Sequence, residues 1–121
     1  MKIVVFSESD YNFSAKLSKI CNSQSDQLFF LNDFESLKKF QNQKKILLII
    51  DFNDYRNKLK FVFNSIKSID NFPSCILIDI IESKIQKEAT DIGFDIIMTK
   101  QMFLVNILTI KNQIINRNYK A

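Results

Sequence analysis

The sequence predicts an α/β domain built on a five-stranded parallel sheet, and two patterns indicate this fold. Short apolar runs alternate along the chain with segments whose apolar residues have helical spacing. Each run is continuously apolar rather than alternating, which is typical of parallel strands covered on both faces. Short strand–helix units with right-handed crossovers favour a doubly wound sheet. For five strands we expect the order 2-1-3-4-5, which is the flavodoxin-like (βα)5 arrangement.

The expected strands are rich in Ile, Val, Leu or Phe. They cover residues 3–6, 28–31, 46–50, 75–81 and 94–98. Pro73 lies just before the fourth strand and suits a loop.

The segments between the runs each carry an apolar stripe on one predicted helical face. Gly93 directly follows the fourth segment and is expected to cap its C-terminus. The five stripes are Phe13, Leu17, Ile20 and Cys21; Phe34, Leu37 and Phe40; Leu59, Val62, Phe63 and Ile66; Ile85, Ala89 and Ile92; and Leu104, Ile107, Leu108, Ile114 and Ile115.

Composition narrows the possible functions. The 121 residues suffice for a single domain, 1–121, with a core that needs no disulfide or metal. The chain has no histidine, which excludes histidine-ligated zinc and Ser-His-Asp triads. Cys21 and Cys75 lack metal-ligand spacing, so we expect buried thiols in a reducing cytoplasm. No stretch approaches the roughly 20 apolar residues of a membrane span, so no membrane partner is expected.

The net charge of +4 is mild, and a nucleic-acid partner is not expected from it. The densest basic cluster is Lys38, Lys39, Lys44 and Lys45. No arginine lies among these lysines and only one aromatic residue, Phe40, lies between them, which is not the interleaved pattern that base stacking requires. We therefore interpret the cluster as a solvated face.

Acidic residues and one lysine gather where the expected strands end. Carboxyl ends of parallel strands meet at one edge of a sheet, and the neighbouring strands one and three flank the place where open α/β sheets bind ligands. Carboxylates with a lysine suit Mg²⁺ and phosphate chemistry. The residues are Glu8 and Asp10 after the first strand, Asp51 at the end of the third, Asp79 within the fourth and Lys100 after the fifth.

Each of these residues also has a purely structural interpretation. Asp51 could cap or solvate a strand end, and Lys100 could pair with it without any phosphate. Glu8 and Asp10 could cap the first helix, which is the interpretation we favour for Asp10. Asp79 is flanked by isoleucines, so it should point to solvent or pair with Lys100. If Asp51 and Lys100 share a site, the charged ends of their side chains should lie within roughly 8 Å of each other, about one Debye length.

The pattern resembles the response-regulator receiver domain of bacterial two-component signalling over essentially the whole chain. Asp51 stands where receivers carry the aspartate that accepts phosphate. Gly93 and Lys100 have the seven-residue spacing of the family's final stretch, around Asp95-Ile96-Ile97-Met98-Thr99-Lys100. The resemblance implies that Asp51 is the phospho-acceptor candidate and that Lys100 is the candidate to pair with the phosphate.

The chain also departs from the receiver pattern. Phe6 and Ser7 stand where receivers carry two adjacent acids that hold Mg²⁺. Ile78 stands in place of the hydroxyl residue after strand four, and Ile97 in place of the aromatic switch residue. Only weak metal candidates remain, namely Glu8, Asp10 and Asp51. The resemblance therefore implies no cofactor, with Mg²⁺ binding that is weak if it occurs.

We interpret the chain as a stand-alone pseudo-receiver, a cytoplasmic signalling module that is not an enzyme. It would act on a signalling protein through an exposed face of its last two helices, with Phe103 and Ile110 as the candidate contact residues. The alternative is a phosphorylatable receiver that takes phosphate on Asp51, with Mg²⁺ held by Glu8, Asp10 or Asp54. A nucleotide binder is disfavoured, because Ser7-Glu8-Ser9 is not a Gly-rich phosphate loop.

Overall fold

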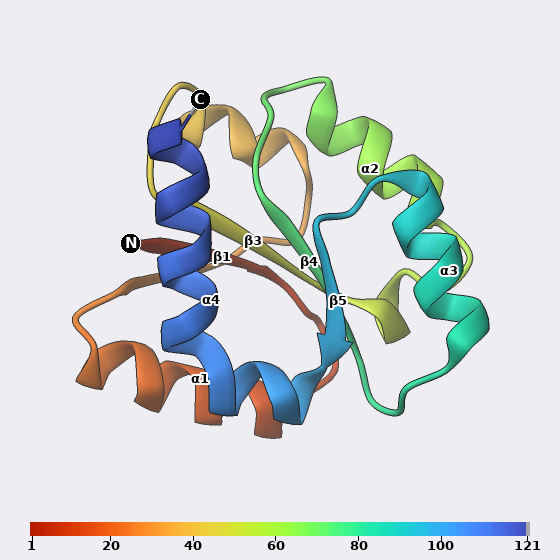
Figure 1. The fold of residues 1–121 in the computed structure, drawn as a ribbon, viewed down its shortest axis with the longest axis horizontal. Coiled ribbons are helices and arrows are strands. Elements are labelled where there is room, and N and C mark those ends of the chain that lie inside the picture. The colour runs from red at the N-terminus through yellow and green to blue at the C-terminus, as the bar shows by residue number, and fades with distance from the viewer. Residues whose placement is uncertain (121) are drawn as a thin grey trace.

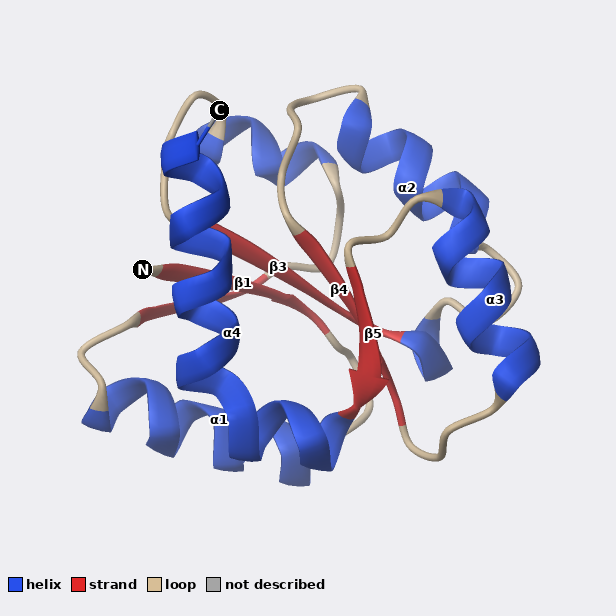
Figure 2. Cartoon of the chain, in the orientation of Figure 1, coloured by secondary structure: helices blue, strands red, loops and turns tan. Residues whose placement is uncertain are grey.

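The sheet has the predicted order. A computed structural model describes the backbone of residues 1–120 and the side chains of residues 1–115. All neighbouring strands pair in parallel, in the order β2-β1-β3-β4-β5. Figure 2 draws the strands in red and the helices in blue. The strands are β1 (Lys2–Phe6), β2 (Gln27–Phe30), β3 (Ile46–Asp51), β4 (Ser74–Ile78) and β5 (Ile96–Thr99).

Four α-helices and a 3-10 helix cover the sheet (Figure 1). α1 and α4 pack on one face, and η1, α2 and α3 pack on the other, so each face has its own core cluster. A further 3-10 turn, η2, follows β3 directly. The bounds are α1 (Tyr11–Ser23), η1 (Glu35–Phe40), η2 (Phe52–Asp54), α2 (Leu59–Lys67), α3 (Ser83–Ile92) and α4 (Lys100–Lys120).

The second expected helix is not an α-helix, and this part of the prediction is wrong. The segment forms the six-residue 3-10 helix η1. Its apolar residues Phe34, Leu37 and Phe40 recur strictly every three residues, which is the period of a 3-10 helix. Leu37 and Phe40 are buried against the sheet, so the tighter helix keeps its stripe aligned with the core.

The fourth strand is shorter than expected. It ends at Ile78, so Asp79 follows the strand rather than lying within it. Ile80 and Ile81 extend the apolar run in sequence, but both side chains are exposed. Asp79 is therefore not held between two buried isoleucines, and the free-energy cost of burying its charge does not arise.

The candidate contact residues on the last helix are buried, which corrects the prediction. Phe103 is 0% exposed and Ile110 is 3% exposed, and both belong to the core cluster between α4 and the sheet. Leu108, which was expected in the buried stripe, is 57% exposed instead. In this structure Phe103 and Ile110 cannot form an interaction face.

Gly93 caps α3 as predicted. It has a φ of 124°, and its N–H donates to the carbonyl oxygen of Ala89 at 3.2 Å. Positive φ is readily available to glycine because glycine has no Cβ. The ring of Phe63 occupies the space that a Cβ would need.

A buried ion-pair network fastens α4 to the segment before β2. Lys111 on α4 is buried, and its ammonium contacts Asp26 and Gln24. Asp26 also lies 3.4 Å from the α-ammonium of Met1. Lys111 therefore contributes no free charge to the surface of α4.

Both cysteines are free and buried, as expected. Burial raises the pKa of the Cys21 thiol to about 11 and raises the pKa of Cys75 as well. Within the part of the chain that the structure describes, no helix is long and apolar enough to cross a lipid bilayer.

Candidate functional site

Lys100 is at the centre of the acidic edge. It is the first residue of α4, directly after β5, and its side chain is buried. Its ammonium lies 2.9 Å from Asp10, 2.9 Å from Asp51 and 3.0 Å from Asp79. A lysine ammonium has three N–H donors, so each donor has its own carboxylate. The prediction that Asp51 and Lys100 lie close together is confirmed.

The charge state of this cluster follows from those contacts. Burial by itself would lower the pKa of Lys100, but the hydrogen bonds to Asp10, Asp51 and Asp79 outweigh burial and raise it. Lys100 is therefore a permanent cation at neutral pH. It offsets only one of the three negative charges that surround it, and the edge stays acidic.

Asp51 is enclosed by its neighbours. Its side chain is 2% exposed, and both of its oxygens accept hydrogen bonds. Ser7 Oγ donates to Oδ2 at 2.9 Å, and the Asn53 N–H donates to Oδ1 at 3.1 Å. The latter bond caps η2, so the structural role considered for Asp51, a cap at a strand end, is present.

Asp10 has two roles at once. Its Oδ1 accepts the N–H of Phe13 at 2.9 Å, so Asp10 is the N-cap of α1, as favoured from the sequence. Its Oδ2 binds Lys100. The Lys100 hydrogen bond, followed by the Phe13 N–H, lowers the pKa of Asp10.

Asp79 is the most exposed of the three carboxylates that contact Lys100. It is the residue directly after β4, and its side chain is about half exposed. It binds Lys100 and also accepts a hydrogen bond from the side-chain amide of Asn53. These two contacts, the Lys100 bond first, lower the pKa of Asp79. Asp79 thus pairs with Lys100, one of the two roles expected for it.

Asp54 binds the loop between β1 and α1. Its Oδ2 accepts the backbone N–H of Glu8 at 2.9 Å, and its Oδ1 accepts Ser9 Oγ at 2.8 Å. An internal carboxylate therefore occupies donors that a phosphate-binding loop would offer to a ligand. Glu8 itself is exposed, and the bond that ties it to this edge comes from its backbone.

Sequence reasoning missed two residues of this site, Ser7 and Asn53. Ser7 was noted only as a missing acid, whereas its hydroxyl binds the buried carboxylate of Asp51. Asn53 links Asp51, through its backbone, to Asp79, through its side chain. The sequence does place both polar residues just after strands, Ser7 after β1 and Asn53 after β3. Both positions lie at the carboxyl edge of the sheet, and this was the available signal that they belong to the site.

The carboxylates do not fit a Mg²⁺ ion as they are arranged. Mg²⁺ requires near-octahedral oxygen ligands at about 2.0–2.1 Å. Here the ammonium of Lys100 lies among Asp10, Asp51 and Asp79, where such an ion would have to bind. Within the described residues, no group of three or more Asp, Glu, Cys or His side chains is arranged to hold a metal ion.

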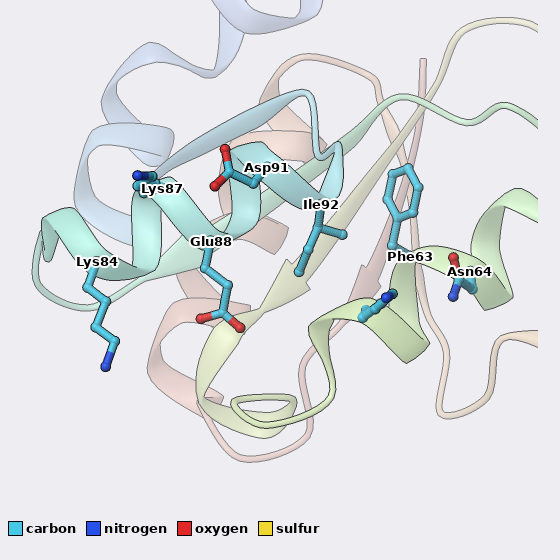
Figure 3. Close-up of a pocket in the computed structure, with 8 residues that line it drawn as sticks. Phe63, Asn64, Lys84, Lys87, Glu88, Asp91 and Ile92 are labelled. Carbon is cyan, nitrogen blue, oxygen red and sulfur yellow. The ribbon is translucent and has the colours of Figure 1, made fainter.

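A separate hollow of about 560 Å³ lies between α2 and α3 (Figure 3). Phe63 and Ile92 supply apolar lining, and Lys84, Lys87 and Glu88 stand on the α3 side. None of the residues of the Lys100 cluster lines this hollow, so it is not part of the acidic site.

The fold is that of response-regulator receivers, as two solved structures show. A response regulator from Thermotoga maritima matches with a TM-score of 0.72 and 15% identity, covering 95% of this chain and 97% of that one. A response regulator in red light signaling of R. palustris matches with a TM-score of 0.64 and 17% identity, covering 90% of each chain. At such identities the likeness concerns the fold alone.

The same α/β arrangement also occurs within an enzyme. The apo structure of D-lactate dehydrogenase from Escherichia coli matches with a TM-score of 0.52 and 16% identity. The match covers 83% of this chain and 31% of that one. The fold by itself therefore does not decide between signalling and catalysis.

By sequence, the chain belongs to the family described as the Sigma-54 interaction domain, whose model matches residues 3–91. The matched region runs from β1 into α3 and includes Asp10, Asp51 and Asp79. It does not include β5, Lys100 or α4. No curated protein matches the sequence.

Proposed function

We propose that the protein is a receiver-fold signalling module that acts through protein–protein interaction and is not switched by phosphorylation of Asp51. One observation carries this proposal: each of the three N–H donors of Lys100 is bound to a carboxylate of the chain itself. A phosphoryl group on Asp51 would meet an ammonium that already binds two other carboxylates, Asp10 and Asp79. The site thus has its own anions where a phosphorylated receiver would gain one.

The burial of Asp51 supports the same conclusion. Phosphoryl transfer requires the attacking oxygen to lie in line with the donor, with metal ions to offset the charge on the phosphoryl oxygens. Asp51 is almost fully covered, both of its oxygens are bound, and an ammonium occupies the space for a metal. Each of these features would have to be undone before transfer.

The two positions that would transmit a phosphorylation signal carry unsuitable side chains. The resemblance to receivers implies a hydroxyl residue after β4 and an aromatic residue on β5, and Ile78 and Ile97 take these positions. Ile78 is buried in the core and Ile97 packs against it. Neither side chain can hydrogen-bond to a phosphate. A ligand shifts an equilibrium only if it binds two states differently, and here it would have no such contact.

The alternative is a phosphorylatable receiver, and one observation favours it. Asp51 ends β3 at the carboxyl edge with Lys100 only 2.9 Å away, which is a geometry that phosphate acceptance could use. This alternative requires a divalent ion to enter a cluster whose carboxylates already share the ammonium of Lys100.

The first partner to test is sigma-54, because the family's description names an interaction with it. We expect sigma-54 to bind the unmodified protein and Asp51→Asn with the same affinity, within about twofold. Addition of Mg²⁺ and acetyl phosphate should leave both affinities unchanged. Titration calorimetry or biolayer interferometry measures this. Binding that appears only with acetyl phosphate and disappears in Asp51→Asn would replace the proposal with the phosphorylatable alternative.

A further inference from the structure

The hollow between α2 and α3 combines an apolar lining with polar side chains (Figure 3). Its volume of about 560 Å³ lies within the usual range of small-molecule sites, about 300–1,000 Å³. Phe63 on α2 and Ile92 at the end of α3 supply the apolar lining, and both side chains are only half-buried. Apolar surface on both helices therefore remains open to a ligand.

The ring of Phe63 is held in place by its neighbours. It occupies the space that a Cβ on residue 93 would need, so Gly93 allows the ring to pack closely against the end of α3. Phe94 packs edge-on against the same ring, with the two centroids 5.3 Å apart. The ammonium of Lys67 lies 5.5 Å from the ring centroid. The apolar part of the hollow is therefore formed before a ligand arrives, as is usual for small-molecule sites.

The charged residues that α3 contributes to the hollow offset one another. Lys84 precedes Glu88 by four residues, and Lys87 precedes Asp91 by four residues. Side chains four residues apart are neighbours on the surface of a helix, so each of these lysines has an acid beside it. An anionic ligand would gain little net attraction from α3.

Lys60 on α2 has no such acid beside it. The residues three and four positions away on either side are Arg56, Asn57, Phe63 and Asn64. Within the part of the chain that the structure describes, the side chains of Lys60 and Asn64 have no hydrogen-bond or ion-pair partner, and both are exposed. Both line the hollow and lie one turn apart on α2, so an ammonium and an amide are available to one anionic group.

We propose that this hollow binds a small carboxylic acid anion with an aromatic or branched apolar body. The carboxylate accepts hydrogen bonds from the Lys60 ammonium and the Asn64 amide, and the apolar body packs between Phe63 and Ile92. The apolar lining provides contact area, and Lys60 makes the site prefer an anion to a neutral molecule of the same shape. No residue of the Lys100 cluster lines the hollow, so this inference does not rest on the proposed function.

Titration with 4-phenylbutyrate, followed by backbone amide NMR, tests the proposal, and 4-phenylbutanamide is the neutral ligand of the same shape. We expect saturable shifts centred on α2 and α3, with a Kd of about 0.1–1 mM for the carboxylate. The unaltered protein should bind the carboxylate about threefold more tightly than the amide, which is the usual contribution of one exposed ion pair. Added salt should reduce this preference, because it screens exposed charges.

Lys60→Gln removes the ammonium while leaving the apolar lining unchanged. This variant should bind the carboxylate and the amide with equal affinity. Lys19→Gln is the matched control, because Lys19 is an exposed lysine on α1, which packs on the opposite face of the sheet. It should keep the threefold preference of the unaltered protein.

Three results would overturn the proposal. The first is the absence of saturable shifts at α2 and α3 with up to about 10 mM carboxylate, ten times the weakest expected Kd. The second is equal binding of the two ligands by the unaltered protein. The third is a preference for the carboxylate that survives in Lys60→Gln.

Discussion

Replacing Lys100 with methionine should lower the free energy of unfolding by about 3–5 kcal/mol at pH 7, the usual cost of removing one partner of a buried ion pair. The substitution leaves three carboxylates without their common cation. Asp51 among them is buried and cannot turn to water. Urea unfolding followed by circular dichroism measures the change.

The pH dependence of stability on the acid side should also become weaker in Lys100→Met. In the unaltered protein the pKa values of Asp10 and Asp79 are lowered, so their stabilisation is present above the unfolded value, about 4, and is lost as the pH falls. The raised pKa of Lys100 makes its contribution complete below about pH 10 and lost as the pH rises further. Without the lysine, Asp10 and Asp79 lose the contact that lowers their pKa values most. The variant should therefore lose less stability than the unaltered protein as the pH falls through about 4.

The matched control is Lys84→Met, because Lys84 is an exposed lysine on α3 that lines the separate hollow between α2 and α3. Its effect should stay within about 0.5 kcal/mol, as is usual for a surface substitution. If Lys100→Met lowers the free energy of unfolding no more than Lys84→Met does, the Lys100 cluster does not stabilise the fold.

Gly93→Ala should lower the free energy of unfolding by about 2–4 kcal/mol, combining backbone strain with overpacking. The backbone φ of 124° is one that residues with a Cβ rarely adopt. The added Cβ would also lie 2.8 Å from Cζ of Phe63. That ring packs edge-on against Phe94 and lines the hollow between α2 and α3, so turning it away from the Cβ would disturb its packing against Phe94. Thermal and urea unfolding both measure the loss.

A double-mutant cycle with Phe63→Leu separates the two causes. The shorter side chain relieves the contact, so in that background Gly93→Ala should cost only the backbone part, about 1–2 kcal/mol. An identical cost in both backgrounds would mean that the contact with Phe63 contributes nothing.

The sheet was predictable because its strands are covered on both faces and therefore appear as continuous apolar runs. The last helix was harder to orient, for a physical reason. Its buried residues Phe103, Ile107, Ile110 and Ile114 repeat at intervals of three and four, and the exposed residues Val105 and Leu108 lie three residues apart on the opposite side. Periodicity finds two stripes and cannot tell which one faces the sheet. Only the packing of the sheet and α1 against the first stripe decides this.

The candidate site was predictable in part. Asp51 ends β3 and Lys100 directly follows β5, so their proximity followed from the topology, although the fifth strand lies at Ile96–Thr99 rather than at the expected residues 94–98. Asp79 was assigned to the fourth strand because Ile80 and Ile81 prolong the apolar run, and exposed isoleucines cannot be told from buried ones by composition. The contacts of Ser7 and Asn53 depend on side-chain and loop geometry, which strand patterns do not specify.

The central claim is that the Lys100 cluster keeps Mg²⁺ and a phosphoryl group away from Asp51. Titration with Mg²⁺ and beryllofluoride, followed by backbone amide NMR, tests it most directly. Ser7→Asp serves as the comparison variant, because Ser7 Oγ lies 2.9 Å from Asp51 Oδ2 and a carboxylate there would give a cation a second ligand. Phe6→Asp is unsuitable, because Phe6 is fully buried against Phe34 and the new charge would lie in the core.

We predict that the amide resonances around Asp51 in the unaltered protein do not shift at millimolar Mg²⁺ and beryllofluoride, whereas Ser7→Asp shows stronger Mg²⁺ binding. Saturable shifts centred on Asp51 in the unaltered protein would contradict the account.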